Sequence, residues 1–237
     1  MKGDILDESS LLSVSTVGIL DLLFPKRCVS CGRIGRYFCD SCRKGIRVIN
    51  SYELICPECG RRALDGKTHP GCRSKYGLDG LTSFFHYSGP VREAVKTIKY
   101  RLVRDLASEF VSLVPDTFGV TAGDAIVIPV PLHTSRLRFR GFNQAEVIGE
   151  KLAERFGLIV CKKALYRIRK TEPQVSMRSR NERFGNMKNV FWAGGTVKNK
   201  SIMLFDDVFT TGATMKSAAH ALKRAGAKHV WAVTMAR

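Results

Sequence analysis

The feature that most constrains the fold is a short segment near the carboxyl end of the chain, residues 202–214. It begins with Ile-Met-Leu-Phe, continues with the adjacent acids Asp206 and Asp207, and then enters a turn rich in threonine and glycine. Helical spacing of apolar residues starts directly afterwards, at Met215. A fully apolar strand is typical of a parallel sheet that is covered on both faces. Ligands of such sheets bind at the carboxyl ends of the strands, where these polar residues lie.

The turn after the acids has the composition of an anion site. Gly212 permits a tight turn in which backbone N–H groups converge, and the following helix adds the positive end of its dipole. Hydroxyl groups surround this glycine, and the predicted phosphate-binding residues are Thr210, Thr211, Gly212, Ala213 and Thr214. A simpler alternative is a helix cap, in which a threonine or aspartate only satisfies backbone donors.

The acid pair needs a different partner, because Asp206 and Asp207 would repel a phosphate. Carboxylates suit the vicinal hydroxyl groups of a ribose, or a Mg²⁺ ion carried by a pyrophosphate. The segment therefore predicts a site for a phosphorylated pentose.

Strand and helix patterns alternate through the remainder of the chain. Apolar runs predict strands at 81–87, 125–131, 201–205 and 229–236, and helical spacing occurs over 91–114, 142–156 and 215–225. This alternation predicts the α/β class, with a parallel sheet flanked by helices. We expect this domain to span 81–237.

Cysteines are concentrated before that domain, with seven of the 8 in the chain between residues 28 and 72. Cys28 and Cys31 form one CxxC pair, and Cys39 and Cys42 form a second one close by. Two such pairs supply the tetrahedral set of four sulfurs that Zn²⁺ favours. Redox-active dithiols are the alternative. The acids near the amino end do not resemble an export signal, so we expect a cytoplasmic protein, in which metal is favoured over disulfides.

A second metal site is predicted from Cys56, Cys59, His69 and Cys72. His69 and Cys72 keep the CxxC spacing with histidine in the first position, which makes a Cys₃His zinc site. Both sites have four protein ligands and leave no position for water, so we expect structural zinc, in one or two sites. The remaining Cys161 lies in a strand-like stretch and is expected to be a buried small residue.

The region 1–80 is therefore expected to be a small zinc-ribbon-like module that follows a short amphipathic helix at 11–24. Its cysteine-, glycine- and arginine-rich part has few long apolar runs, and modules of this kind need an additional staple such as a metal ion. No apolar run approaches the roughly 18 residues that a membrane span requires.

Basic residues exceed acidic ones by 39 to 21, which gives a formal net charge of +18. Such an excess is typical of a protein that binds polyanions. Candidate partners are pyrophosphate compounds, nucleic acid and the acidic face of a membrane, which the protein would contact peripherally. A basic solvated surface is the alternative, and metal-bound thiolates would lower the net charge.

Two segments are rich in basic residues, and the first follows the strand predicted at 125–131. In the first, an expected loop carries Arg136, Arg138 and Arg140, whose guanidinium groups suit bidentate contacts to pyrophosphate. A helix is expected to begin with Asn143 and Gln144, whose side chains can hydrogen-bond a ligand. The alternative is an exposed loop with a helix cap.

The second segment, 167–187, has little periodicity and many charges. It fits a lid over an anionic substrate, or a strip of phosphate contacts for single-stranded nucleic acid. Phe184, Phe191 and Trp192 could stack on bases or belong to the core.

Residues 202–214 resemble the signature of type I phosphoribosyltransferases. In that family the acids contact the ribose hydroxyls and the Thr/Gly turn holds the 5′-phosphate, which implies these roles for Asp206, Asp207 and residues 210–214. Purine-salvage members carry an aspartate where this chain has Thr210, so this chain departs from them.

The chain as a whole is similar to the ComF family of competence-associated, phosphoribosyltransferase-like proteins. The resemblance follows the motif order from the cysteine module onward, through Ile98-Lys99-Tyr100, Pro129-Val-Pro131, Arg140-Gly-Phe-Asn-Gln144, Lys170-Thr-Glu-Pro-Gln174 and Arg180-Asn-Glu-Arg183. It implies a type I phosphoribosyltransferase fold with an amino-terminal zinc module. We also count Lys99 among the substrate-binding residues on this basis.

Two functions fit these expectations. The first is an enzyme that binds phosphoribosyl pyrophosphate with Mg²⁺ and transfers its sugar to a nitrogen acceptor, with Asp206, Asp207 and Arg140 as catalytic residues. The second is a competence factor that binds single-stranded DNA, uses the sugar-phosphate site without turnover, and contacts a partner such as a helicase. A ligand-sensing regulator is a third possibility, but no helix-turn-helix pattern supports it.

Overall fold

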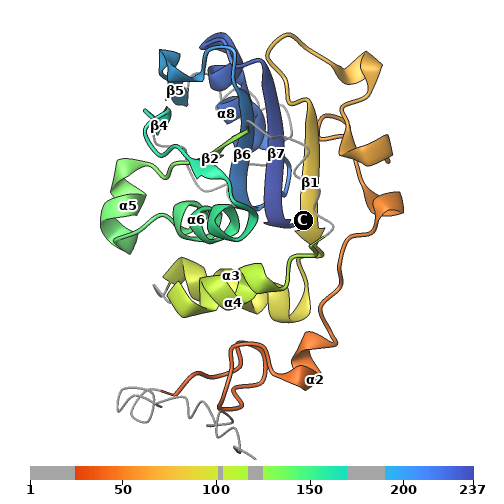
Figure 1. The fold of residues 1–237 in the computed structure, drawn as a ribbon, viewed down its shortest axis with the longest axis vertical. Helices are drawn as coiled ribbons and strands as arrows, with labels where there is room; N and C mark the ends of the chain where they lie inside the picture. The colour runs from red at the N-terminus through yellow and green to blue at the C-terminus, as the bar shows by residue number, and fades with distance from the viewer. Residues whose placement is uncertain (1–24, 101–103, 117–124, 170–189) are drawn as a thin grey trace, which may run out of the picture.

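The computed structural model describes residues 25–100, 104–116, 125–169 and 190–237 (Figure 1). The helix expected over 11–24 lies outside these residues, and so do the motifs at 170–174 and 180–183. Of the second basic segment, only its first three residues, 167–169, are described.

A five-stranded sheet with the order β1-β7-β6-β2-β3 forms the centre of the protein, and every neighbouring pair is parallel. Its strands are β1 (Gly80–Phe85), β2 (Ile126–Pro129), β3 (Ile159–Val160), β6 (Ser201–Val208) and β7 (His229–Ala236). This arrangement confirms the expected α/β class. β6 is the middle strand, so a residue at its carboxyl end has neighbours on both sides.

Helices cover both faces of the sheet (Figure 1). α3 (Gly89–Tyr100), α4 (Arg104–Ser112) and α6 (Gln144–Phe156) pack on one face, and α8 (Ala213–Arg224) packs on the other. The alternation of side chains along β6 divides its residues between the two cores. Met203 and Phe205 join the core under α3, α4 and α6, whereas Ile202 and Leu204 join the core under α8.

Three elements differ from the sequence expectation. The helical spacing over 91–114 belongs to two helices, α3 and α4. The expected basic loop contains the helix α5 (Thr134–Arg140), because His133 caps its start and Gly141, at φ 77°, ends it in the left-handed conformation. β6 continues through both acids, because its ladder with β7 extends to Val208.

A small antiparallel ribbon lies over the α8 face and consists of β4 (Leu165–Arg167) and β5 (Phe191–Ala193), followed by the turn η5 (Gly195–Val197). Phe191 is buried in the α8 core, whereas Trp192 is exposed. Cys161, which we expected to be buried, is only partly buried against the same core.

The cysteine-rich segment contains only short helices, namely α2 (Asp40–Arg43), η1 (Ser51–Glu53), η2 (Leu64–Gly66) and η3 (Pro70–Cys72). In Figure 1 it runs from α2, beside α4, along the outside of β1. Phe38 anchors its first part in the main core, where its ring stacks on Phe110 at 5.8 Å. Among the described residues, no helix is long and apolar enough to cross a bilayer.

Candidate functional site

The predicted phosphate turn lies between the carboxyl end of β6 and the first residue of α8. Gly212 adopts the left-handed conformation, with φ 74°, and stands at the N-cap position of α8. No side chain caps this helix end, although such a cap was the simpler alternative for the threonines. The first N–H groups of α8 are therefore available to an anion.

The threonine side chains line this turn on its outer side. Thr210 and Thr211 are exposed and Thr214 is half-buried, whereas Gly212 and Ala213 are buried. A Cβ atom on Gly212 would lie 2.5 Å from Phe209 Cζ, so the ring of Phe209 fills the space beneath the turn. The turn thus offers hydroxyl and N–H groups on a packed base.

Asp207 is almost fully buried, at 4% exposure, on the face of β6 that carries α3 and α6. Its Oδ2 lies 3.1 Å from Lys99 Nζ in α3. The same oxygen makes no well-aligned hydrogen bond with the described residues, so the contact with Lys99 is an ion pair rather than a directed bond. This pair brings the predicted Lys99 to the end of β6.

Asp206 is half-buried and points toward the opposite face of the strand, as the alternation along β6 requires. Its Oδ1 accepts a hydrogen bond from the backbone N–H of Asp207 at 2.8 Å. Burial, followed by the negative charge of Asp207, raises the pKa of Asp206 to about 8. Near neutral pH this carboxyl therefore holds a proton that a ligand or a cation can displace.

Two further arginines contribute to the electrostatics near Asp206. Burial lowers the pKa of Arg167, at the end of β4, and so does the positive charge of Arg136 in α5, while Asp206 raises it. Arg167 therefore interacts electrostatically with both Asp206 and Arg136. Sequence reasoning had not singled out Arg167, although it begins the basic segment 167–187.

Arg140, at the end of α5, faces the end of α3. Its guanidinium lies 6.0 Å from the ring centroid of Tyr100, and its Nη1 donates to Gln144 Oε1 at 2.8 Å. Two of the recognised motifs, at 98–100 and 140–144, therefore meet in space.

The side chain of Asn143, which we expected to bind substrate, makes hydrogen bonds within the protein. Its Oδ1 accepts the N–H of Ala145 and caps α6, and its Nδ2 donates to Val130 O at 3.0 Å. Together with Gly141, which ends α5, it shapes the connection between two helices. Gln144 is also buried and its Oε1 is taken by Arg140.

The first metal-binding set brings the sulfurs of Cys28, Cys31, Cys39 and Cys42 within 4.8 Å of one another. Burial alone would raise the pKa of Cys28, but hydrogen bonds from backbone N–H groups, led by that of Cys39, lower it to about 6. Four sulfurs at this spacing, one of them predisposed to the thiolate form, fit structural Zn²⁺.

The second set, Cys56, Cys59, His69 and Cys72, is equally compact. His69 Nδ1 lies 3.4 Å from Cys59 Sγ, and His69 Nε2 lies 2.8 Å from Arg62 O. Because the carbonyl can only accept, Nε2 carries the proton and Nδ1 is left with its lone pair toward the metal position. The donor set fits a Cys₃His zinc site.

The two sites share a local repeat that the sequence reading had missed. Gly32 N–H donates to Cys28 O at 2.9 Å, and Gly60 N–H donates to Cys56 O at the same distance. Both glycines have a positive φ, 76° and 74°. The signal was the shared string Cys-x-x-Cys-Gly-Arg, at 28–33 and 56–61.

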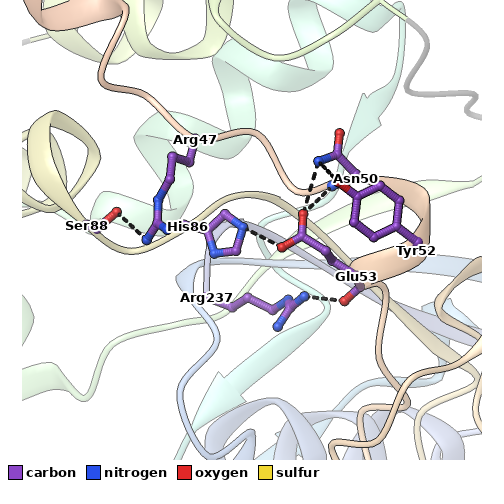
Figure 2. A network of polar contacts seen from close by, with 7 residues as sticks. All are labelled: Arg47, Asn50, Tyr52, Glu53, His86, Ser88 and Arg237. Atoms are coloured by element: carbon purple, nitrogen blue, oxygen red, sulfur yellow. Dashed lines mark hydrogen bonds and ion pairs between the residues drawn. The ribbon is translucent and has the colours of Figure 1, made fainter.

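A polar network ties the segment between the two zinc sites to the carboxyl edge of the sheet (Figure 2). Glu53 Oε1 lies 2.9 Å from Nε2 of His86, which follows β1. Arg237, which follows β7, donates to Glu53 O. Arg47 reaches Ser88 Oγ at 3.3 Å on the other side of this group. The cysteine-rich segment is therefore anchored at the same edge of the sheet as the ligand turn.

Two family models match the chain. Residues 19–74 match a double zinc ribbon domain, and residues 143–237 match a phosphoribosyl transferase domain. The first covers both cysteine sets, and the second covers β6, the acid pair and the turn. Both expected components, the phosphoribosyltransferase fold and the amino-terminal zinc module, are confirmed.

Curated relatives resemble the chain over most of its length. Competence protein ComFC of Bacillus subtilis is 28% identical, over 79% of this chain and 78% of its own. DNA utilization protein YhgH of Salmonella typhimurium is 29% identical, over 81% and 86%. Competence protein F of Haemophilus influenzae is 26% identical, over 90% and 98%. Each of these alignments covers about four fifths or more of this chain.

Proposed function

We propose that this chain, which belongs to the ComF family of phosphoribosyltransferase-like proteins with a double zinc ribbon, binds phosphoribosyl pyrophosphate and transfers the phosphoribosyl group to a nitrogen acceptor. The names of its relatives support a role for this activity in the uptake or use of DNA.

The arrangement around Gly212 carries the proposal. An uncapped helix start, a left-handed glycine and exposed threonine hydroxyls meet at the end of a strand that also holds two acids. In the proposed complex the 5′-phosphate lies on the N–H groups at residues 212–214. Asp206 faces the ribose hydroxyls, and Asp207 stays paired with Lys99.

The reaction requires negative charge to be stabilised on the leaving pyrophosphate. Mg²⁺ would arrive with the pyrophosphate and neutralise part of this charge. We assign the rest of this stabilisation to Arg136, Arg140 and Arg167. Arg167 interacts electrostatically with Asp206 and with Arg136, and Arg140 lies 6.0 Å from the ring of Tyr100, which follows Lys99 in α3. The bond between C1′ and the pyrophosphate oxygen breaks, and the acceptor nitrogen forms the new bond to C1′. Catalysis is then mainly electrostatic and positional.

The second candidate is a single-stranded DNA-binding competence factor that uses the sugar-phosphate site without turnover. A dense basic surface on the first zinc ribbon favours it, because Asp40 is the only acid between residues 26 and 48. The exposed cations there are Arg27, Arg33, Arg36, Arg43, Lys44 and Arg47. Exposed cations of this density attract phosphate backbones.

Calorimetric titration with phosphoribosyl pyrophosphate and Mg²⁺ tests the ligand. Wild-type protein should bind, and Asp206→Asn combined with Asp207→Asn should abolish binding. Asp105→Asn combined with Glu154→Gln is the matched control, because it removes two exposed acids that lie on α4 and α6. Normal folding of the wild type without binding would refute the proposal.

A second assay separates the two candidates. Pyrophosphate release in the presence of a nucleobase mixture would support transfer, whereas steeply salt-dependent binding of single-stranded DNA without release would support the second candidate. The acid-pair variant should retain DNA binding if the two surfaces are separate.

A further inference from the structure

The second zinc knuckle makes direct contact with the helix that begins at the phosphate turn. Lys216, in the first turn of α8, donates to Glu58 O at 3.0 Å and lies 3.1 Å from Glu58 Oε2. Glu58 stands between the metal ligands Cys56 and Cys59. Both partners are largely buried, with side-chain exposures of 14% for Lys216 and 23% for Glu58.

Lys216 is also part of the turn's own construction. Its N–H donates to Gly212 O at 2.8 Å, which closes the first turn of α8. Its Cε would lie 3.3 Å from a Cβ on Gly212, so its aliphatic stem packs against the glycine. A displacement of this side chain would therefore reach the N–H groups proposed to hold the 5′-phosphate.

A bound metal fixes the backbone of the knuckle in which Glu58 lies. The loop between Cys56 and Cys59 is closed by the hydrogen bond from Gly60 N–H to Cys56 O and by the ligands on either side of Glu58. Without the ion, the four ligand atoms have no common partner, and structural zinc sites of this kind lose their fold. The carbonyl and carboxylate that hold Lys216 would then lose their fixed positions.

The contact of this ribbon with α8 is not limited to one pair. The ring of Tyr76 packs edge-on against His220, one turn further along the helix, at 5.1 Å. The first zinc ribbon docks elsewhere, on α4, where Glu109 accepts the N–H groups of Tyr37 and Phe38.

We propose that the second zinc site is a positioning element of the phosphate turn, acting through Glu58 and Lys216. The inference rests on the proposed binding of a phosphorylated ribose. It assigns to the Cys56/Cys59/His69/Cys72 site a role in ligand affinity, and to the first zinc site none.

The substitution Glu58→Gln tests whether Lys216 supports the shape of the phosphate turn or only contributes positive charge to the ligand site. If Lys216 served the ligand only as a cation, loss of the neighbouring carboxylate would leave phosphate affinity unchanged or raise it. Positioning predicts the opposite sign, a Kd for ribose 5-phosphate that increases about fivefold or more, within the usual range of coupling between sites. Lys216→Met should weaken binding similarly, and Lys216→Arg should retain most of the affinity.

Asp65→Asn is the matched control. Asp65 is an exposed acid of the same ribbon, and its carboxylate pairs with Lys67 at 3.0 Å rather than with Lys216. Its removal changes the net charge by the same amount and should leave the Kd unchanged.

Linkage supplies a second readout that needs no turnover. If the zinc site strengthens ligand binding, then ribose 5-phosphate must strengthen zinc retention by the same factor. In a colorimetric chelator titration of the wild type, ligand should protect one of the two zinc ions from extraction. Glu58→Gln should lose this protection, whereas Glu109→Gln, at the first ribbon, should keep it.

The outcomes separate the two proposals. Wild-type binding that is unaffected by Glu58→Gln, or zinc extraction that is independent of ligand, would overturn the coupling and leave the proposed function intact. Failure of the folded wild type to bind ribose 5-phosphate or phosphoribosyl pyrophosphate would instead refute the proposed function. If Glu58→Gln does not fold, the chelator titration of the wild type still decides.

Discussion

Lys99 Nζ lies 3.1 Å from the buried Oδ2 of Asp207, and this ion pair joins the carboxyl-terminal turn of α3 to the end of β6. The contact compensates a carboxylate that has no well-aligned hydrogen bond at that oxygen. Lys99 remains 26% exposed, so the pair stands at the border between the core and the ligand edge. Lys99, which we expect to bind substrate, therefore also stabilises the fold.

Lys99→Met should destabilise the fold, because it leaves the Asp207 charge buried and uncompensated. Removal of one partner of a buried pair typically costs about 3 kcal/mol. Urea denaturation at pH 7 would measure the loss. Lys96→Met is the control, since Lys96 forms an exposed pair with Glu93 on the same helix, and its loss should change stability by less than about 1 kcal/mol. Equal effects of the two substitutions would contradict the assignment.

Asp206 should make stability depend on pH in the direction opposite to that of an ordinary ion-paired acid. Its pKa in the folded protein is raised to about 8, above the unfolded value of about 3.9. Between these values the folded state binds more protons, so its stability falls as pH rises. Asp206→Asn should therefore gain thermal stability relative to the wild type as the pH is raised from 5 to 9.

Melting temperatures at several pH values would test this sign. Asp105→Asn, at an exposed position on α4, should show no such trend. A wild-type-minus-variant difference that is constant across the range would exclude a raised pKa for Asp206.

The sequence predicted the sheet well because buried parallel strands leave a strong signal. The strand expected at 229–236 has the observed bounds of β7, and the apolar run at 201–205 lies within β6. The boundary error at β6 has a physical cause. Asp206 and Asp207 are polar, but their backbone groups continue the hydrogen-bonded pairing with β7. Backbone pairing does not require apolar side chains, so the apolar pattern ends before the strand does.

The site was predicted in part. The turn at 210–214 follows from local chemistry, because glycine, threonine and a helix start are adjacent in sequence. The contacts of Lys99 with Asp207, and of Lys216 with Glu58, join residues far apart in the chain, and no local pattern encodes them. Asn143 shows another limit of the local pattern, since its side chain caps α6 and donates to Val130 O, and the sequence encodes neither contact.

The second metal site predicts a zinc content that depends on His69. Elemental analysis of the wild type should give about two zinc ions per chain, and His69→Ala should give about one, because three ligands remain. His69→Cys should keep both, since a thiolate restores the usual four-ligand set. A wild-type value near one would remove this site, and an unchanged value in His69→Ala would show that the histidine is not a ligand.

Gly212→Ala should disrupt the phosphate turn for two separable reasons. A non-glycine residue at φ 74° costs about 1 kcal/mol, and the new Cβ would lie 2.5 Å from Phe209 Cζ. Overpacking of this kind adds roughly 1–3 kcal/mol. We expect a loss of about 2–4 kcal/mol in urea denaturation, together with loss of ribose 5-phosphate binding. Gly195→Ala is the control, because a Cβ there meets no atom within 4 Å.

A double-mutant cycle with Phe209→Leu separates the two causes of the Gly212→Ala defect. The smaller side chain should relieve the steric part, so the double variant should be more stable than the sum of the single losses predicts. The backbone part should persist, because leucine at position 209 does not change φ at position 212. Simple additivity in the cycle would mean that the ring does not support the turn, and undiminished ligand binding by Gly212→Ala would mean that the phosphate does not lie on it.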